Sequence, residues 1–449
     1  MRLLFLALVC TSCAAAPRAP TNATAPSVAW TVSVGRDLRL VEHICWQDFV
    51  PDRVVPESER GVPFARIVRR SPGCIDVVVD LGAMARELQD ETLLRTAGDV
   101  VYGSFDPWLW RPEPWPKGMV GRLRLELPDG IGASLPNERA ASGEWLVPFS
   151  TWSFMARVAI GPLTVDTITA AGAAIAITRL PGAAPGISAE GARRFVMEAA
   201  SAVASLDGRM PTDRVQLLLG PGSARNDDPV QFGMAMRGAG PGVVLRVAPS
   251  ATDASIRGEW VTVHELSHLW LPPVDSDDAW FSEGFASYYQ NIVRSRAGTY
   301  SEAEAWAELL AGFDRGRAQA GALPLREAHS PRFQQIYWGG AAVWLALDVE
   351  LRAHGASLDA VVARLRRASP DNGGPMARLD ERPALELLAL LEQGTGRDLR
   401  GIAGRALAAP FPDVGPTLAA LGIRQTGDGL VLDEAAPQAA VRRAIAARR

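Results

Sequence analysis

The segment VTVHELSHLW, residues 261–270, constrains this chain more than any other. It places His264 and His268 four residues apart, so on a helix both rings lie on one face, one turn apart. Glu265 follows the first histidine directly and is rotated to the side of that face. Apolar residues flank the motif, which indicates a buried helix whose polar side chains need partners. The pattern therefore predicts a helix that offers two nitrogen ligands to one metal ion.

A third ligand is expected from the next segment, AWFSEGFASYYQNIV, where Glu283 lies fifteen residues after His268. The intervening LPPVDSDD contains two prolines, so the first helix ends there and the chain can reverse. Glu283 then falls in the first turn of an antiparallel helix that faces the histidines. Its alternative role is to complement the dipole of its own helix. Two histidines and a carboxylate suit zinc with an open coordination position, and Glu265 is then placed to take a proton from water.

HELSHLW followed by WFSEGFASYY resembles the gluzincin metallopeptidases, especially the aminopeptidase-N-like and glycyl-aminopeptidase-like families. The resemblance implies that His264, His268 and Glu283 bind one zinc ion and that Glu265 is the catalytic base and later proton donor. The segment IYWGGAAVWLALDVELRAHG is similar to another part of these families, whose tyrosine stabilises the tetrahedral intermediate. That role falls on Tyr337, which would otherwise be interpreted as a core tyrosine. The resemblance extends over about residues 186–400.

Three departures from the family pattern affect specificity. Fourteen residues separate the second histidine from the glutamate, against eighteen in the aminopeptidase-N branch, so the intervening loop is shorter. The stretch FGMAMRG has Ala235 or Met236 where the families have the glutamate that binds the amino group of the substrate. Trp338 stands where the families have a lysine. Peptide hydrolysis is still expected, but the choice between endo- and aminopeptidase activity stays open, and a blocked amino terminus should not prevent cleavage.

Weaker candidates lie near these motifs. His329 could approach a substrate, although a loop histidine bonded to its neighbours is the simpler interpretation. Ser287, one turn after Glu283, could support a ligand or only pack within its helix. Asp275, Asp277 and Asp278 lack the spacing of a calcium loop and are expected to cap the second helix.

The hydrophobic pattern predicts an α+β protein. Short apolar or alternating runs predict an antiparallel β domain over residues 28–180. Helical periodicity then predicts a mostly helical catalytic domain, thermolysin-like by the gluzincin resemblance, over residues 186–408, with a C-terminal appendage over 409–449. The expected helices span residues 189–206, 253–271, 279–296, 301–320, 333–354, 357–368, 383–394 and 436–447.

The first residues, MRLLFLALVCTSCAAAPRAP, resemble a secretory leader over residues 1–16, with a charge at Arg2 followed by a short apolar run. Cleavage before Cys13 would produce a lipid-anchored lipoprotein, and cleavage within residues 14–16 a secreted or periplasmic protein. Residues 17–27 are expected to be a linker. The protein is therefore expected to be exported, in or beyond a bacterial cell envelope, with membrane attachment only through a lipidated Cys13.

Cys45 and Cys74 remain after removal of the leader and are expected to form a disulfide, with two buried thiols as the alternative. The net charge of −4 and the absence of a basic stripe argue against nucleic-acid binding. The sequence therefore predicts an exported zinc peptidase that acts on peptides or proteins. The alternative is a non-catalytic envelope protein whose zinc site serves structure or partner binding. The oligomeric state stays open.

Overall fold

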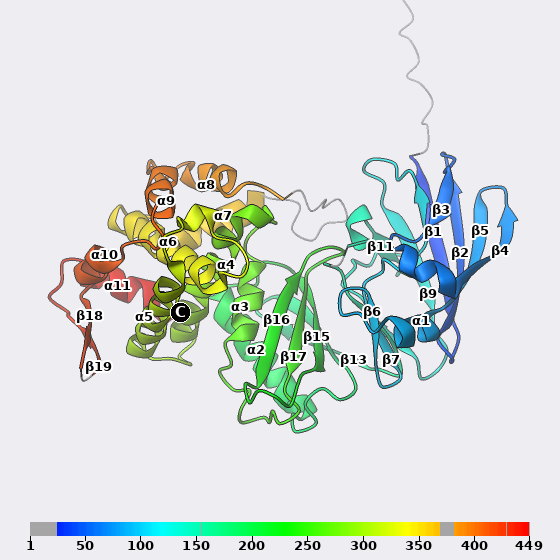
Figure 1. Ribbon diagram of the computed structural model, residues 1–449, viewed down its shortest axis with the longest axis horizontal. Helices are drawn as coiled ribbons and strands as arrows, with labels where there is room; N and C mark the ends of the chain where they lie inside the picture. Colours follow the sequence, from blue (N-terminus) through cyan, green and yellow to red (C-terminus); the bar gives the residue numbers. More distant parts are fainter. Residues whose placement is uncertain (1–24, 154, 369–380, 428, 449) are drawn as a thin grey trace, which may run out of the picture.

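The computed structural model describes residues 25–153, 155–368, 381–427 and 429–448, so the predicted leader lies outside the described residues. An N-terminal β domain, a five-stranded sheet and a helical body follow one another from right to left in Figure 1. The expectation of an α+β protein with a β-rich first half and a helical second half is confirmed. Within the described ranges, no helix combines the length and apolar character that a bilayer span requires.

Two sheets and a buried core form the N-terminal domain. The larger sheet is antiparallel except for the parallel pair β1 and β9. Its order is β11 (Trp145–Val147), β9 (Gly121–Glu126), β1 (Ser27–Val34), β2 (Arg39–Gln47), β5 (Cys74–Asp80) and β4 (Ala65–Ser71). The smaller sheet has the order β10 (Gly132–Ser134), β12 (Val158–Gly161), β7 (Val100–Gly103) and β6 (Leu94–Ala97). A short pair, β3 (Arg53–Val55) and β8 (Arg111–Glu113), and helix α1 (Leu81–Leu88) complete it.

The tryptophan- and proline-rich segment 105–118 contributes to this core. Trp30 of β1 is buried, its ring stacks on Trp115 at 6.1 Å, and its Nε1 donates to the Trp110 carbonyl at 2.7 Å. Trp108 is fully buried as well. These aromatic rings therefore pack within the core of the N-terminal domain.

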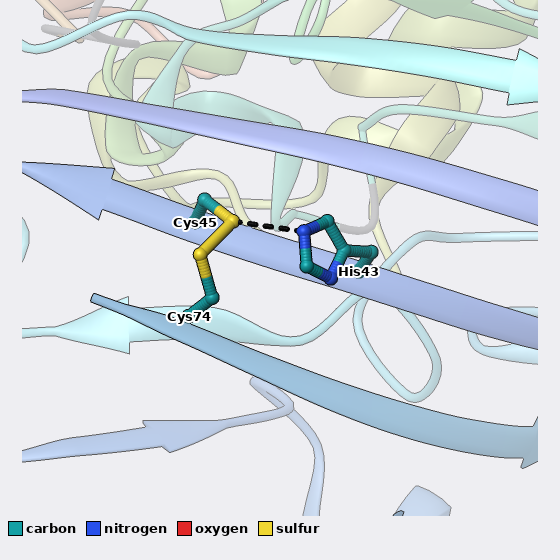
Figure 2. A group of neighbouring side chains, drawn as sticks. All are labelled: His43, Cys45 and Cys74. Atoms are coloured by element: carbon teal, nitrogen blue, oxygen red, sulfur yellow. Dashed lines mark hydrogen bonds between the residues drawn. A yellow bond between two sulfur atoms is a disulfide. The ribbon is translucent and has the colours of Figure 1, made fainter. Parts of the chain in front are cut away.

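Cys45 and Cys74 are directly opposite each other on β2 and β5 and form a disulfide, which confirms that prediction and excludes the two-thiol alternative (Figure 2). His43 lies beside the disulfide, with its Nε2 3.0 Å from the Cys45 Sγ. The other ring nitrogen, Nδ1, lies 2.6 Å from an Asp76 carboxylate oxygen.

The central sheet has the order β13 (Val165–Ala170), β14 (Ala173–Arg179), β15 (Arg214–Pro221), β17 (Gly242–Val247) and β16 (Val230–Met236). The sequence assigned residues 165–179 to the N-terminal domain, but β14 pairs with β15, so β13 and β14 extend the sheet of the following domain. Ala173, Ile175 and Ile177 pack in the same core as helix α2 (Ala189–Ala204), which explains this pairing.

The helical body contains α3 (Val261–His268), α4 (Ala279–Arg296), α5 (Glu302–Ala320), α6 (Phe333–Ala353), α7 (Leu358–Ala368), α8 (Ala384–Glu392) and α9 (Leu399–Leu407). The bounds of α4 to α8 match the sequence prediction within two residues, α9 was not predicted, and the helix expected at 253–271 is much shorter. Gly258 has a φ of 68°, which a right-handed helix does not allow. Glu259 then accepts hydrogen bonds from the backbone N–H groups of Val261 and Thr262, so α3 begins at Val261.

The C-terminal segment is integrated into the helical body and is not a separate appendage. It contains α10 (Gly415–Leu421), the hairpin β18 (Ile423–Thr426) and β19 (Gly429–Leu432), and α11 (Ala439–Ala446). Arg296 of α4 donates to the Ile445 carbonyl at 2.8 Å, and Arg442 of α11 donates to Glu302 at 2.8 Å. The Ile445 side chain is fully buried, so α11 forms part of the core around α4 and α5.

Candidate metal centre

Helices α3 and α4 bring the three predicted ligands together. The helices are antiparallel, since His264 contacts Glu283 and Gln290 while His268 contacts Ser282. Helix α4 begins at Ala279, so Glu283 lies at the start of its second turn and not in the first turn, where the sequence placed it. The Nε2 atoms of the two histidines are 3.2 Å apart, and a Glu283 oxygen lies 3.2 Å and 3.5 Å from them.

These separations fit a zinc ion. Ligand atoms about 2.0–2.1 Å from a tetrahedral zinc ion lie about 3.3 Å from one another, close to the three distances in this structure. His264, His268 and Glu283 are the donor set that leaves one position open for water or substrate. Both imidazoles are almost fully buried, which excludes bulk water from most of the ligand shell. The side chains present therefore suit a zinc site of the catalytic type.

Two further side chains orient the histidines. Gln290 Oε1 lies 2.8 Å from His264 Nδ1, and Ser282 Oγ lies 2.9 Å from His268 Nδ1. A partner on Nδ1 fixes the ring so that the Nε2 lone pair faces the metal. The sequence analysis missed both residues and proposed Ser287, which is buried in α4. Gln290 follows Glu283 by seven residues and so shares its helix face, a signal that could have identified it.

Glu265 lies beside the ligands, almost fully buried on α3. Burial raises the pKa of its carboxyl, although the neighbouring histidines and a hydrogen bond from the Ala235 N–H favour the charged form. For Glu283, burial alone would raise the pKa, but the charge on His268 and hydrogen bonds from both histidines hold it well below its usual range. The lowered pKa of Glu283 keeps its carboxylate ionised, as a metal ligand must be. The raised pKa of Glu265 makes it the better group to accept and donate a proton.

Tyr337 of α6 reaches the same site, as predicted. Its ring stacks on His264 with centroids 5.9 Å apart, and its hydroxyl lies close to Glu283. Burial, followed by the charges of Glu283 and Glu265, raises the pKa of Tyr337, so the hydroxyl remains a hydrogen-bond donor at neutral pH. The position depends on Gly284 and Gly340, because a Cβ on Gly284 would lie 2.3 Å from the Gly340 carbonyl carbon. These glycines let α4 and α6 pack closely.

The centre opens into a cavity of about 430 Å³. Glu265, His268, Glu283 and Tyr337 form one part of its wall, and strand β16 with Arg237 forms another. Ala235 and Met236, at the position of the family's amine-binding glutamate, supply no carboxylate there. The β16 residues in the wall are Phe232, Gly233, Met234 and Ala235. The other described lining residues are Ser153, Met155, Pro273, Val274, Asp275, Ser276, Ala279, Ser282 and Glu381.

None of the weaker candidates joins the cluster of His264, His268 and Glu283. The exposed His329 ring hydrogen-bonds to the Glu327 carbonyl at 2.9 Å, in agreement with the loop interpretation. Asp275 lines the cavity, but its carboxylate accepts from the Asp277 N–H and caps the turn before α4. Asp278 precedes α4 without capping it through its side chain and instead accepts from Ala384 N. The prediction that the aspartates cap α4 is therefore wrong.

Comparisons with known proteins agree with this geometry. The model of the M61 glycyl aminopeptidase family matches residues 271–332, which include Glu283. No protein in the curated collection of sequences matches the chain. Among solved structures, an aminopeptidase N family protein from Idiomarina loihiensis has a TM-score of 0.62 at 14% identity. That alignment covers 88% of this chain and 78% of the other.

Two further structures are M1 zinc metallopeptidases. A two-domain variant bound to L-arginine has a TM-score of 0.51 at 14% identity, and a variant from Deinococcus radiodurans has 0.50 at 15%. Both alignments cover 86% of this chain and 95% of the other. At such identities the likeness establishes the fold, and the M61 match supports a peptide-bond hydrolase. The resemblance to the gluzincins is thus confirmed: the chain has the fold of the M1 zinc metallopeptidases, and its residues 271–332 are similar to the M61 glycyl aminopeptidases.

Proposed function

We propose that this protein is a zinc-dependent peptidase with a single ion held by His264, His268 and Glu283. The observation that carries the proposal is the convergence of the three ligand atoms within 3.5 Å of one another, beside Glu265 and at the wall of a cavity. Glu265 is not one of the three metal ligands, so its place beside them needs another explanation. A structural zinc site does not need such a carboxylate, whereas peptide hydrolysis does.

Each side chain then has one task. A bound zinc ion would polarise the peptide carbonyl and activate water. Glu265 accepts the proton of the attacking water and afterwards donates it to the leaving amine. Tyr337 donates a hydrogen bond from its hydroxyl to the oxyanion that forms on the former carbonyl oxygen, where charge develops in the transition state. Gln290 and Ser282 hold the two imidazoles in place.

Strand β16 supports the binding of an extended peptide. It is the last strand of the central sheet, so its outer edge has no strand partner among the described residues. Its residues from Phe232 to Ala235 line the cavity beside Glu265. A peptide that adds to this edge as another strand would place its backbone next to the metal ligands. A peptide strand added to this edge can continue past the metal ligands in both directions.

We also propose that the protein is exported. The disulfide between Cys45 and Cys74 supports an oxidising compartment, and the sequence of residues 1–16 supports a leader. Fractionation of cells that produce the full chain, with labelled fatty acid, tests both forms of export. Fatty-acid label that depends on Cys13 would indicate a lipoprotein. Unlabelled protein outside the cytoplasm would indicate a leader cleaved within residues 14–16. Protein confined to the cytoplasm would contradict the proposal.

Digestion of a peptide library, read by mass spectrometry, tests the peptidase function. We expect cleavage by the zinc-loaded protein, none after chelation and recovery on return of zinc. Glu265→Gln should retain zinc but lose at least about a hundredfold in kcat, the scale of general acid–base catalysis. Glu198→Gln, an exposed substitution on α2, is the matched control and should cleave normally. Zinc binding without cleavage of any peptide, or full activity in Glu265→Gln, would favour the non-catalytic alternative.

A further inference from the structure

Arg237 is a cationic side chain in the wall of the proposed peptidase cavity. It follows β16 directly and lines the cavity together with Glu265, His268, Glu283 and Tyr337. One of its Nη atoms donates a hydrogen bond to the His268 carbonyl, at the end of the helix that carries both histidines. This bond fixes the guanidinium next to the metal ligands. Arg237 is therefore held at the position where a substrate must lie.

The guanidinium has unused bonding capacity. Its Nε is buried and makes no hydrogen bond, and no carboxylate of the described residues lies within ion-pair distance of Arg237. The nearest negative charges that act on it are those of Glu283 and Glu265. Both are committed elsewhere, Glu283 to the metal and Glu265 to proton transfer. A partly buried arginine without a carboxylate partner carries a desolvation cost that an incoming anion would offset.

The strand beside Arg237 supplies no acidic side chain that could pair with it. A Cβ on Gly233 would lie 2.5 Å from the Glu265 Cγ, so this position approaches the zinc helix too closely for any side chain. Ala235, two residues further along the strand, has only a methyl group. Neither position supplies an acidic group that could neutralise Arg237. Asp275, which also lines the cavity, already accepts a hydrogen bond from the Asp277 N–H.

We propose that Arg237 binds a carboxylate of the substrate, so that the site selects peptides with a negative group close to the scissile bond. This inference rests on the proposed peptidase function and specifies its substrate class. The carboxylate can be that of an aspartate or glutamate side chain or that of the chain terminus, since both present two oxygens to a guanidinium. An amino terminus, being cationic, gains nothing from Arg237. Peptides with a blocked amino terminus are therefore suitable substrates.

Peptide hydroxamates bound to the zinc-loaded protein provide a direct test that does not require turnover. One pair of probes differs only in a glutamate against a glutamine next to the hydroxamate. A second pair differs only in a free against an amidated carboxyl terminus. We expect the anionic member of one pair to bind the wild-type protein roughly ten- to a hundredfold more tightly, the range of a charge-assisted hydrogen bond. The pair that shows the difference identifies the source of the carboxylate.

Substitutions of Arg237 then assign the effect. Arg237→Gln should remove the preference for the anionic probe, while Arg237→Lys, which keeps the charge but not the planar donors, should restore part of it. Arg225→Gln, an exposed loop substitution, is the matched control and should leave the preference unchanged. Zinc content and thermal transition, measured for every variant, separate loss of recognition from loss of the site. For a peptide that carries the carboxylate, Arg237→Gln should raise KM with little change in kcat.

The outcomes separate this inference from the proposed function. Equal binding of anionic and neutral probes by wild-type protein that cleaves peptides would overturn the role of Arg237 and leave the peptidase function intact. A preference for cationic probes would overturn it too and would point to Asp275 and Glu381 in the same cavity. Failure of every hydroxamate to bind, with no peptide cleaved, would reject the peptidase function itself. The comparison on wild-type protein decides the question even if Arg237→Gln does not fold.

Discussion

Among the residues that the structure describes, two clusters bring a histidine together with other metal-ligating side chains, and they differ in almost every other respect. In the N-terminal domain, His43 lies beside Cys45 and Cys74 on one face of the large sheet (Figure 2). In the helical body, His264 and His268 face Glu283 across two helices. In both clusters the potential ligand atoms lie within 4.8 Å of one another. Proximity alone would therefore make both clusters metal sites.

The difference lies in which lone pairs are available. The two sulfur atoms near His43 are bonded to each other, so neither is a thiolate, and the imidazole is about half exposed with a side-chain accessibility of 51%. His264 has a side-chain accessibility of only 5%, and its Nδ1 is occupied by Gln290, which leaves Nε2 for a metal. A metal site thus requires unbonded donor atoms, burial and oriented rings, and only the second cluster has all three.

Substitution of the histidines gives the largest expected contrast between the clusters. Purified wild-type protein should bind about one zinc ion, and His264→Ala or His268→Ala should reduce this to nearly none, since too few protein ligands remain. His43→Ala should leave the zinc content unchanged. Metal analysis after dialysis against a weak chelator measures all three. Zinc retained in His264→Ala, or lost in His43→Ala, would reverse the assignment of the two clusters.

The local parts of the helical cluster were predictable from the sequence. Four-residue spacing places His264 and His268 on one helix face in any structure in which the helix forms. The proline-containing turn and the apolar periodicity after it placed Glu283 near the start of the next helix. Tyr337 was different, because its place beside His264 depends on a helix more than fifty residues further along the chain. Only the family resemblance identified it.

What the sequence analysis missed depends on long-range contacts. Strands β13 and β14 have the same alternating pattern as the N-terminal strands, and only their pairing with β15 assigns them to the central sheet. The close approach of Gly284 and Gly340 involves two helices far apart in the sequence. The docking of α11 on α4 likewise depends on Arg296 and the Ile445 carbonyl. Periodicity describes one element at a time and contains none of this information.

Tyr337→Phe should have an intermediate effect, confined to turnover. Removal of a donor to the oxyanion lowers kcat by about a hundredfold or more, with little change in KM, because the bond matters mainly in the transition state. Zinc content should remain that of the wild type. Steady-state kinetics on a peptide found in the library digest measures the effect. Unchanged kcat would mean that the Tyr337 hydroxyl only packs against Glu283, in the way that Trp115 packs against Trp30 in the N-terminal domain.

The smallest expected effect concerns the partners that orient the two kinds of histidine. Gln290 supports His264 and Asp76 supports His43 through hydrogen bonds of similar length, 2.8 Å and 2.6 Å. Gln290→Ala should weaken zinc binding by roughly ten- to a hundredfold, the usual consequence of losing a hydrogen bond to a metal-bound histidine. Asp76→Asn should not change it, because His43 holds no metal. Competition with a fluorescent chelator yields both dissociation constants, and the Gln290→Ala protein should still reach one zinc ion at saturation. Equal zinc affinity in the wild type and Gln290→Ala would mean that burial alone orients the His264 ring. The two clusters would then differ in exposure and in free donor atoms, but not in the effect of the hydrogen bond to the histidine.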